Sequence, residues 1–315
     1  MTRSSLAINR LLFLTCFLSL ITHTPAVAQA WVPPEAQLSV SLLYSYSDVG
    51  NHLFSADVID AGVNLGKSID FGDIKAHTMI LGFEYGLTSR FAVSGRLPVV
   101  VSKYDGLIPD NTSVDDGLFR GSAQDFRFDA RYLVLVEPIA LTPIVSVVLP
   151  SHHYETLGHV AVGNDLREIH VGAYTGTALP FISEELYAEA GIEYAIVEDM
   201  ELAAATSGDH STDYATLGVE VGYFFSPYLS INIQGLLKNT YGGFDWLDPM
   251  TGTEEGWYSH DRFAAVDFFH LGGSVSYDIT DHTTLYFGYS NTVWGQNSHE
   301  LESIMLGTSW SFWVP

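Results

Sequence analysis

The stretch QDFRFDARYLVLV, residues 124–136, alternates between two unlike kinds of side chain. From Phe126 to Val136 every second residue is aromatic, aliphatic or alanine, whereas Asp125, Arg127, Asp129 and Arg131 fall between them. A period of two is typical of a β-strand with one apolar and one polar face. The stretch therefore predicts a two-faced strand, and the fold depends on whether its apolar face meets a protein core or lipid.

The same alternation recurs about twelve times along the chain, and no helical stripe is sustained beyond the first 30 residues. Long links and short links between these segments alternate. The long links are 47–73, 105–123, 151–166, 197–213, 240–266 and 292–299, and the short links are 86–90, 137–140, 178–185, 225–228 and 279–283. This order predicts twelve antiparallel strands with both ends of the chain on the short-turn side, as in outer-membrane barrels.

Two folds fit the alternation, because a soluble β-sandwich turns its apolar face inward and a membrane barrel turns it outward. The predicted strands are about 9 to 14 residues long, which exceeds the usual soluble strand and is enough to cross a bilayer at a tilt. Aromatic residues also gather at the predicted strand ends, as at a membrane interface. We therefore expect a closed antiparallel transmembrane β-barrel, with a soluble periplasmic β-protein as the alternative.

The chain begins like a secretory signal peptide. Arg3 and Arg10 precede the apolar run LLFLTCFLSLI, and small residues follow it in an A-x-A pattern. This order predicts cleavage near Ala28 or Ala30. Residues 1–30 are then a signal peptide and residues 31–315 form one barrel domain in the outer membrane of a Gram-negative bacterium. Cys16, the one cysteine, lies in the signal, so the mature chain has no disulfide and no cysteine metal site.

The net charge of the protein and its C-terminal residues indicate which partners it binds. A net charge of −24 predicts that the protein repels nucleic acid. Gly307, Trp310 and Phe312 form a G-x-x-aromatic-x-aromatic pattern, which resembles the signal read by the barrel assembly machinery, although three residues follow it. An ordinary amphipathic strand is the alternative. Outer-membrane lipid and lipopolysaccharide are the other expected partners.

Parity along the strands predicts which charged residues line the lumen. The predicted lumen residues are Glu84, Arg96, Asp125, Arg127, Asp129, Arg131, Glu189, Glu193, Glu220, Lys238 and Asp278. Two roles are open. Cross-strand ion pairs would stabilise the wall and partly fill it, whereas an excess of carboxylates would favour the passage of cations.

No enzyme, cofactor or metal site is expected. His152, His153 and His159 do not match a standard zinc spacing. No His-x-Ser pair of the kind found in barrel phospholipases occurs. The outside loops are acidic and contain Asp115, Asp116 and Asp245. We expect these carboxylates to form a solvated surface, and the more specific alternative is that they bind divalent cations.

Residues 70–150 resemble the outer-membrane proteins named after the meta-pathway of phenol degradation. The resemblance rests on Tyr85–Thr88 with Arg90, on Leu97–Pro98, on Asp125 with Arg131–Tyr132, and on Leu149–Pro150. The family's G-x-G-D element reads Ser122, Ala123, Gln124, Asp125 here, so its glycines are missing. The resemblance implies passage of small solutes, among them hydrophobic or aromatic molecules.

Two functions follow as hypotheses. The first is passive passage of a small-molecule solute through the lumen, gated by the loops 47–73 and 240–266 or by the N-terminal segment WVPPEA. The second is a closed barrel with a structural or surface-binding role.

Overall fold

The computed structural model describes residues 30–54, 68–69, 72–106, 115–156, 158, 161–200, 211–245 and 260–314. Residues 1–29 of the predicted signal peptide lie outside the described residues, as do most residues of the loop at 47–73 and of the loop at 240–266.

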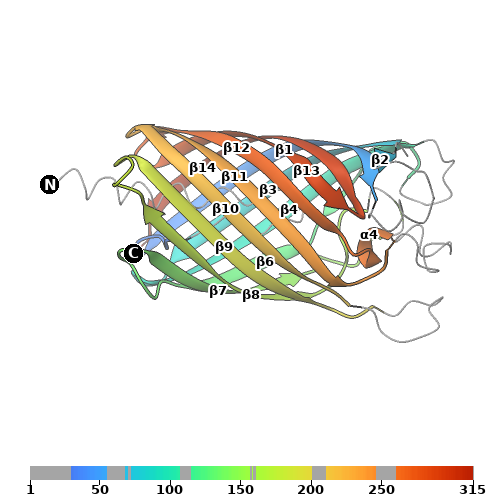
Figure 1. Ribbon diagram of the computed structural model, residues 1–315, viewed down its shortest axis with the longest axis horizontal. Coiled ribbons are helices and arrows are strands. Elements are labelled where there is room, and N and C mark those ends of the chain that lie inside the picture. The colour runs from blue at the N-terminus through green and yellow to red at the C-terminus, as the bar shows by residue number, and fades with distance from the viewer. Residues whose placement is uncertain are drawn as a thin grey trace.

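Twelve long strands form the wall in the described part of the chain (Figure 1). They are β1 (Gln37–Leu53), β3 (Gly72–Gly86), β4 (Phe91–Gly106), β6 (Phe126–Tyr132), β7 (Ala140–Leu149), β8 (Glu168–Ala178), β9 (Leu186–Val197), β10 (Thr212–Ser226), β11 (Leu229–Gly242), β12 (Asp267–Thr280), β13 (Thr283–Gln296) and β14 (Ser298–Trp313). Two short strands, β2 (Ser68–Ile69) and β5 (Arg120–Ala123), pair with β1 and β4. A short helix, α4 (His260–Phe263), lies near the loop end.

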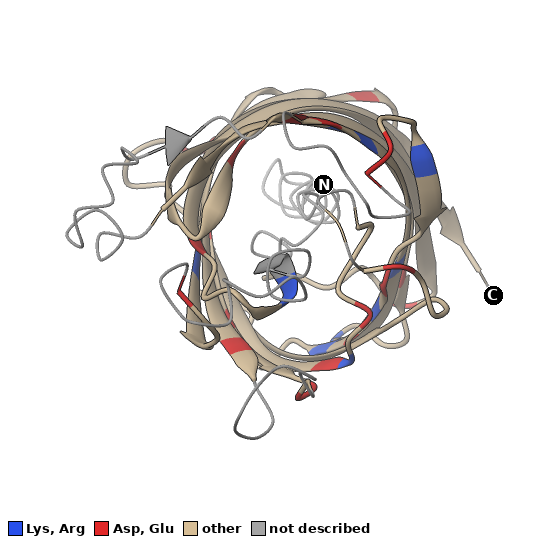
Figure 2. Cartoon of the chain, turned by 90° about the vertical axis from the view of Figure 1, so that its right-hand side faces the viewer, with Lys and Arg blue, Asp and Glu red and all other residues tan. Residues whose placement is uncertain are grey.

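The strands form a closed barrel because the first and last long strands pair with each other. β1 pairs antiparallel with β14, from Gln37 opposite Trp313 to Leu53 opposite Ser298. The remaining long strands pair antiparallel in chain order. Figure 2 looks along the barrel axis and shows the ring of strands. The predicted closed antiparallel barrel of twelve strands is confirmed.

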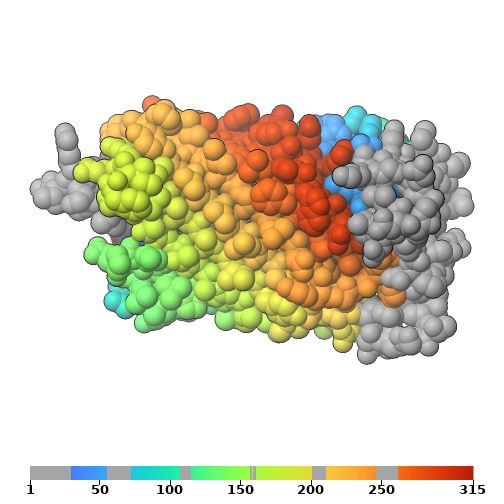
Figure 3. All heavy atoms as spheres, in the orientation of Figure 1, coloured from blue at the N-terminus to red at the C-terminus, as the bar shows by residue number. Residues whose placement is uncertain are grey.

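The apolar faces of the strands point outward, which answers the question of the solvent. On β10, Leu217, Val219 and Val221 are each 43 % exposed, whereas Thr216 and Glu220 are 3 % and 2 % exposed. Exposed apolar side chains also lie on the neighbouring strands, among them Ile192 on β9 and Ile231 on β11. Figure 3 shows the closed outer surface to which these strands contribute. A soluble protein would bury this surface, whereas a bilayer accepts it. Among the described residues, no helix is long and apolar enough to cross a membrane.

The link predicted at 292–299 is wrong. β13 continues to Gln296 and β14 begins at Ser298, so Asn297 alone joins them. Asn297 has a φ of 50°, in the left-handed region that asparagine tolerates better than most residues. The polar side chains at 295–299 resemble a loop in the sequence, but their backbone continues the ladder.

The strand predicted over 124–136 is also shorter, since β6 spans Phe126–Tyr132. Gln124 donates its backbone N–H to Pro98 O at 3.0 Å, and Leu133 donates its N–H to Arg90 O at 2.7 Å. Residues beyond Tyr132 therefore belong to the turn that leads to β7, although their alternation continues.

The N-terminal segment enters the barrel at the end where the short turns lie. Ala30 and Val32 are buried with Ala92, Ile144 and Tyr174, and Trp31 packs against this cluster. Thr142 Oγ1 donates to Ala30 O at 2.5 Å. A Cβ at Gly86 would lie 2.2 Å from Pro34 O, so only glycine permits this approach. The segment therefore narrows the lumen at the turn end.

The outward orientation of Val219 makes a stability prediction. Val219→Arg should lower the free energy of unfolding in a bilayer by about 2–4 kcal/mol. The reason is that Val219 lies in the middle of β10, and a charge at the midplane of the membrane is costly. Ile279→Arg, one residue from the end of β12, should cost only about 0–1 kcal/mol. Urea-induced unfolding in lipid vesicles measures both. Equal costs would contradict this placement of β10 in the membrane.

Candidate functional site: the charged inner wall

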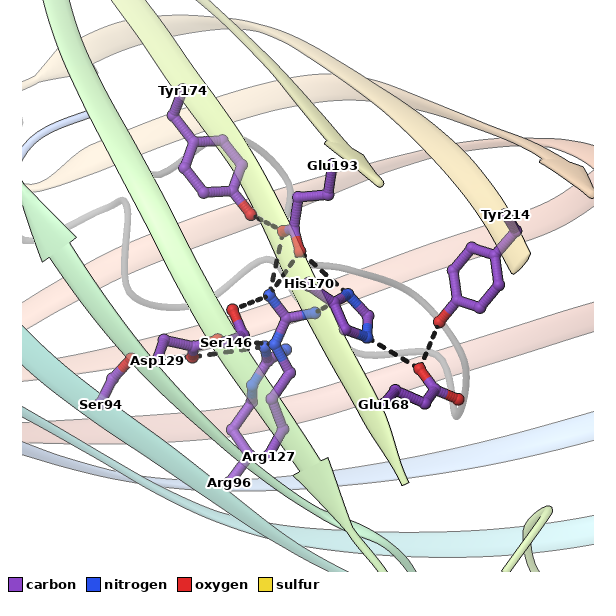
Figure 4. Close-up of polar contacts among 10 residues, drawn as sticks. All are labelled: Ser94, Arg96, Arg127, Asp129, Ser146, Glu168, His170, Tyr174, Glu193 and Tyr214. Carbon is purple, nitrogen blue, oxygen red and sulfur yellow. Dashed lines mark hydrogen bonds and ion pairs between the residues drawn. The ribbon is translucent and has the colours of Figure 1, made fainter. Parts of the chain in front are cut away.

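A cluster of polar side chains covers the inner wall over β4, β6, β7, β8, β9 and β10 (Figure 4). Its members come from alternate positions of neighbouring strands, so the same parity that exposes apolar residues to lipid directs these residues inward. The cluster contains Ser94, Arg96, Arg127, Asp129, Ser146, Glu168, His170, Tyr174, Glu193 and Tyr214.

Arg127 is the centre of the cluster. Its Nε lies 2.6 Å from Asp129 Oδ1, and its Nη2 lies 2.7 Å from Glu193 Oε2 and 2.9 Å from Ser146 Oγ. Asp129 also accepts a hydrogen bond from Ser94 Oγ at 2.9 Å and lies 3.6 Å from Arg96 Nη2. All these groups are removed from bulk water, so each charge depends on its partners. One guanidinium thus holds carboxylates from two strands that are not neighbours.

His170 connects this centre to a second carboxylate. Its Nε2 lies 2.8 Å from Glu168 Oε2, which also accepts from Tyr214 OH at 2.8 Å. Its Nδ1 lies 3.1 Å from Glu193 Oε2 and 3.3 Å from Arg127 Nη1. A protonated Nδ1 donates to Glu193, whereas a bare Nδ1 accepts from Arg127. Tyr174 donates its hydroxyl to Glu193 as well.

Five other predicted lumen residues lie outside this cluster, in an ion pair, in a cation–π contact and near the two ends of the barrel. Arg131 forms a buried ion pair with Glu84, and the ammonium of Lys238 lies 4.2 Å from the ring centre of Tyr214. Asp125 lies outside β6 and accepts from Tyr154 OH, and Asp278 accepts from Thr284 Oγ1 at 2.7 Å near the turn end. These two acids therefore belong to the rims rather than to the cluster.

Glu189 and Glu220 are arranged differently from the other acids. They are direct cross-strand partners on β9 and β10, and both are buried inside the barrel. Glu220 Oε1 accepts from Tyr187 OH at 2.5 Å. Neither has an arginine, lysine or histidine within ion-pair distance among the salt bridges of the described residues.

The inner wall opposite the cluster is built from small hydroxyl side chains. Ser39 Oγ lies 3.1 Å from Ser311 Oγ, and Ser47 Oγ lies 2.6 Å from Ser303 Oγ, across the seam between β1 and β14. The lumen is therefore asymmetric, with long charged side chains on one arc and short polar ones on the other.

Three tyrosines and one histidine of this wall were absent from the predicted lumen residues, namely Tyr174, Tyr187, Tyr214 and His170. His170 and Tyr174 share the parity of Glu168 on β8, so strand periodicity could have found both. Tyrosine resembles a lipid-interface residue in the sequence, which hides the inward role of its hydroxyl.

A second set of contacts covers the loop end. Phe263 of α4 packs with Leu166, Ala195 and Val197, whose side chains lie inside the barrel. Arg262 donates from Nε to Asn164 O at 2.9 Å and from Nη1 to Thr156 Oγ1 at 3.1 Å. These contacts join the 150–167 loop to the segment before β12, and we call this set the loop latch.

Burial changes the acidity of two loop groups. Removal from water lowers the pKa of Arg262 below its ordinary value, although the nearby Asp165 charge opposes this shift. Burial, and the hydrogen bond to Asp125, raise the pKa of Tyr154 well above its ordinary value. Tyr154 therefore remains a neutral donor to Asp125 while it accepts from Asp165 N at 2.9 Å.

The residues that carry the resemblance to the meta-pathway proteins have local structural roles. Thr88 Oγ1 accepts hydrogen bonds from Arg90 N at 3.2 Å and from Phe91 N at 2.9 Å, which fixes the tight turn between β3 and β4. Pro98 accepts from Gln124 N. These contacts explain the pattern by turn and wall geometry, without a solute.

The C-terminal pattern lies on β14 at the barrel seam. Trp310 is opposite Val40 and Phe312 is opposite Leu38 of β1. Gly307 faces inward, and a Cβ there would lie 2.7 Å from Leu43 Cδ1. Its role as an assembly signal stays a prediction.

Comparison with known proteins gives matches at the level of structure. No known protein family matches the sequence, and no curated protein is similar to it in sequence. The COG4313 outer membrane channel from Pseudomonas putida F1 is similar in structure, with a TM-score of 0.65, 13 % identity, and coverage of 90 % of this chain and 98 % of that chain. The fold is that of an outer-membrane β-barrel.

Two other solved structures share the fold. The translocator domain of the autotransporter NalP from Neisseria meningitidis has a TM-score of 0.53 at 13 % identity, and covers 98 % of both chains. The NanC porin has a TM-score of 0.50 at 10 % identity, with 86 % of this chain and 98 % of that chain covered. These three barrels are described as a channel, a translocator domain and a porin.

The dependence of two carboxylates on Arg127 can be tested by substitution. Arg127→Met should lower the free energy of unfolding by about 3–5 kcal/mol, because Asp129 and Glu193 would remain buried without the guanidinium that they share. Arg120→Met, which removes an exposed ion pair with Asp116, should leave the unfolding midpoint unchanged. Urea-induced unfolding in detergent measures both. Equal midpoints would show that the cluster contributes nothing to stability.

Proposed function

We propose that this protein is a channel of the bacterial outer membrane through which small solutes diffuse passively. The observation that carries the proposal is the inner wall, which is rich in buried polar and charged side chains inside a barrel whose outer face is apolar. A polar lumen in a lipid-facing barrel is the arrangement of membrane channels. The structural similarity to an outer membrane channel supports this proposal.

In this proposal, the short turns face the periplasm and the long loops face outside, as in other barrels of the outer membrane. Residues 1–30 then act as the cleaved signal peptide, and the barrel assembly machinery inserts the chain among outer-membrane lipid and lipopolysaccharide.

Both ends of the lumen contain a segment that is not part of the wall. Residues 31–36 lie inside the turn end, and Phe263 of α4 lies inside the loop end. Each is held by a small apolar cluster and a few hydrogen bonds, so each can leave at a modest cost. We therefore propose a gated channel, in which displacement of these segments opens the lumen.

The solute is proposed from the resemblance to the meta-pathway proteins, which implies hydrophobic or aromatic molecules. Inward tyrosines such as Tyr174, Tyr187 and Tyr286 agree with such a solute, because their rings offer apolar surface beside polar hydroxyls. Current block by benzyl alcohol, compared with a sugar of similar size, tests this preference. Block by the sugar alone would exclude it.

The second candidate function is a closed barrel with a structural or surface-binding role. It is favoured by the near-complete burial of the inward side chains, among them Arg131, Tyr174 and Ser303, which are 1 % exposed each. A wall packed this tightly conducts only if the end segments or the cluster rearrange.

Planar-bilayer conductance separates the two functions. The wild-type protein should give small, intermittent currents, and Arg262→Ala should raise the fraction of time spent open several-fold, because it breaks both hydrogen bonds of the loop latch. The control is Arg167→Ala, whose side chain is 73 % exposed and pairs with Glu198 on the surface. If the wild type and both variants stay sealed, the closed barrel is the correct reading.

A further inference from the structure

Glu189 and Glu220 place two carboxylates side by side on the inner wall. They are directly opposite each other in the pairing of β9 with β10, so their Cβ atoms lie about 4.5–5.5 Å apart. The two residues are 3 % and 2 % exposed. Two like charges at this distance, away from water, repel strongly, so the pair requires a positive partner or a shared proton.

The hydrogen bonds around the pair are incomplete. Tyr187 donates to Glu220 Oε1, but Glu220 Oε2 and Glu189 Oε1 are buried and accept no hydrogen bond. Gln234, opposite Glu220 on β11, also has a buried Oε1 without a donor. Three residues aligned across three adjacent strands therefore each contribute one such acceptor oxygen to the same row of the wall.

Glu193 shows how this wall neutralises a carboxylate when an arginine is present. It lies on the same strand and the same face as Glu189. It forms an ion pair with Arg127, lies within hydrogen-bond distance of His170 Nδ1 and accepts a hydrogen bond from Tyr174. Arg131, in contrast, forms its ion pair with Glu84. Among the salt bridges of the described residues, none reaches Glu189 or Glu220, so this pair lacks the arginine partner that Glu193 has.

We propose that Glu189 and Glu220 bind a divalent cation of the calcium type on the inner wall of the barrel. Two carboxylates balance a charge of +2, and Ca²⁺ accepts six to eight oxygen ligands in flexible geometry at about 2.3–2.6 Å. Gln234 supplies an amide oxygen, and water completes the shell. Oxygen donors without nitrogen or sulfur favour a hard cation over zinc.

The site differs from the zinc-like clusters that the sequence excludes. In the described residues, no group of three or more histidine, cysteine, aspartate or glutamate side chains could hold a metal ion. A site of two carboxylates and one amide falls below that number, and Ca²⁺ and its waters tolerate such a sparse set. The inference does not depend on conduction, because a closed barrel would hold the same ion.

Terbium luminescence tests the site directly, since Tb³⁺ replaces Ca²⁺ at oxygen sites and emits when a nearby tyrosine is excited. Tyr187 is the nearby tyrosine, because its hydroxyl donates a hydrogen bond to Glu220. The full-length mature protein in detergent should show saturable Tb³⁺ emission that Ca²⁺ displaces. Glu189→Gln and Glu220→Gln should each weaken this binding at least about tenfold, because each removes one of two charged ligands.

Two further variants make the test specific. Glu302→Gln removes an exposed carboxylate from β14 and should leave the titration unchanged. Tyr187→Phe keeps both carboxylates, so it should retain Ca²⁺ displacement while the sensitised emission falls. The heat-dependent mobility of the barrel on gels reports folding in each case.

The proposal is overturned if the wild type shows no Ca²⁺-displaceable emission, or if its titration equals that of Glu189→Gln and Glu220→Gln. In that event the two carboxyls share a proton. If a glutamine variant fails to fold, the wild type decides alone. Ca²⁺, but not Na⁺ at equal ionic strength, should raise its unfolding temperature by mass action, and an equal effect of both ions would also exclude the site.

Discussion

The backbone ladder between β1 and β14 is the constraint on which the rest of the structure depends. In hydrocarbon no water is available for an unpaired N–H or C=O group, so an open sheet edge is costly. Pairing from Gln37 to Leu53 removes both edges at once. Closure then separates two environments, lipid outside and the lumen inside, and the alternation along each strand assigns every side chain to one of them.

The inner wall solves its electrostatic problem in two ways. Around Arg127, charges of opposite sign are placed so that each buried group has several partners. At Glu189 and Glu220, like charges meet on neighbouring strands, with tyrosine and glutamine beside them. Such a pair is unfavourable in isolation, which is the reason for the cation site proposed there. The opposite arc of serines keeps the wall polar with little volume.

In the proposed channel, the two end segments determine whether the lumen is continuous. Residues 31–36 and α4 enter from opposite ends, and both use apolar side chains to pack against inward positions of the wall. Similar barrels serve as a channel, a porin and a translocator, so the barrel alone does not define a function. In the proposed channel, the wall supplies a polar path and the two segments control access to it.

Local chemistry in the sequence determined the alternation of faces, the number of long strands and the end at which the chain starts and stops. A strand period of two needs no tertiary contact. The sequence alone therefore shows that alternate residues such as Leu217, Val219 and Val221 are apolar and share one face of a strand. The same parity selects Arg127, Asp129 and Glu193 as inward residues. It fails at Asn297, because a single residue in the left-handed region looks like part of a loop.

Tertiary structure alone decided which inward charges meet. Arg127 and Glu193 are 66 positions apart, and their contact depends on barrel curvature and on the register of four strands. Register also made Glu189 the direct neighbour of Glu220, whereas a shift of two residues would have separated them. A repeating period fixes the face of a side chain, but its partner across the wall depends on how far each strand slides against the next.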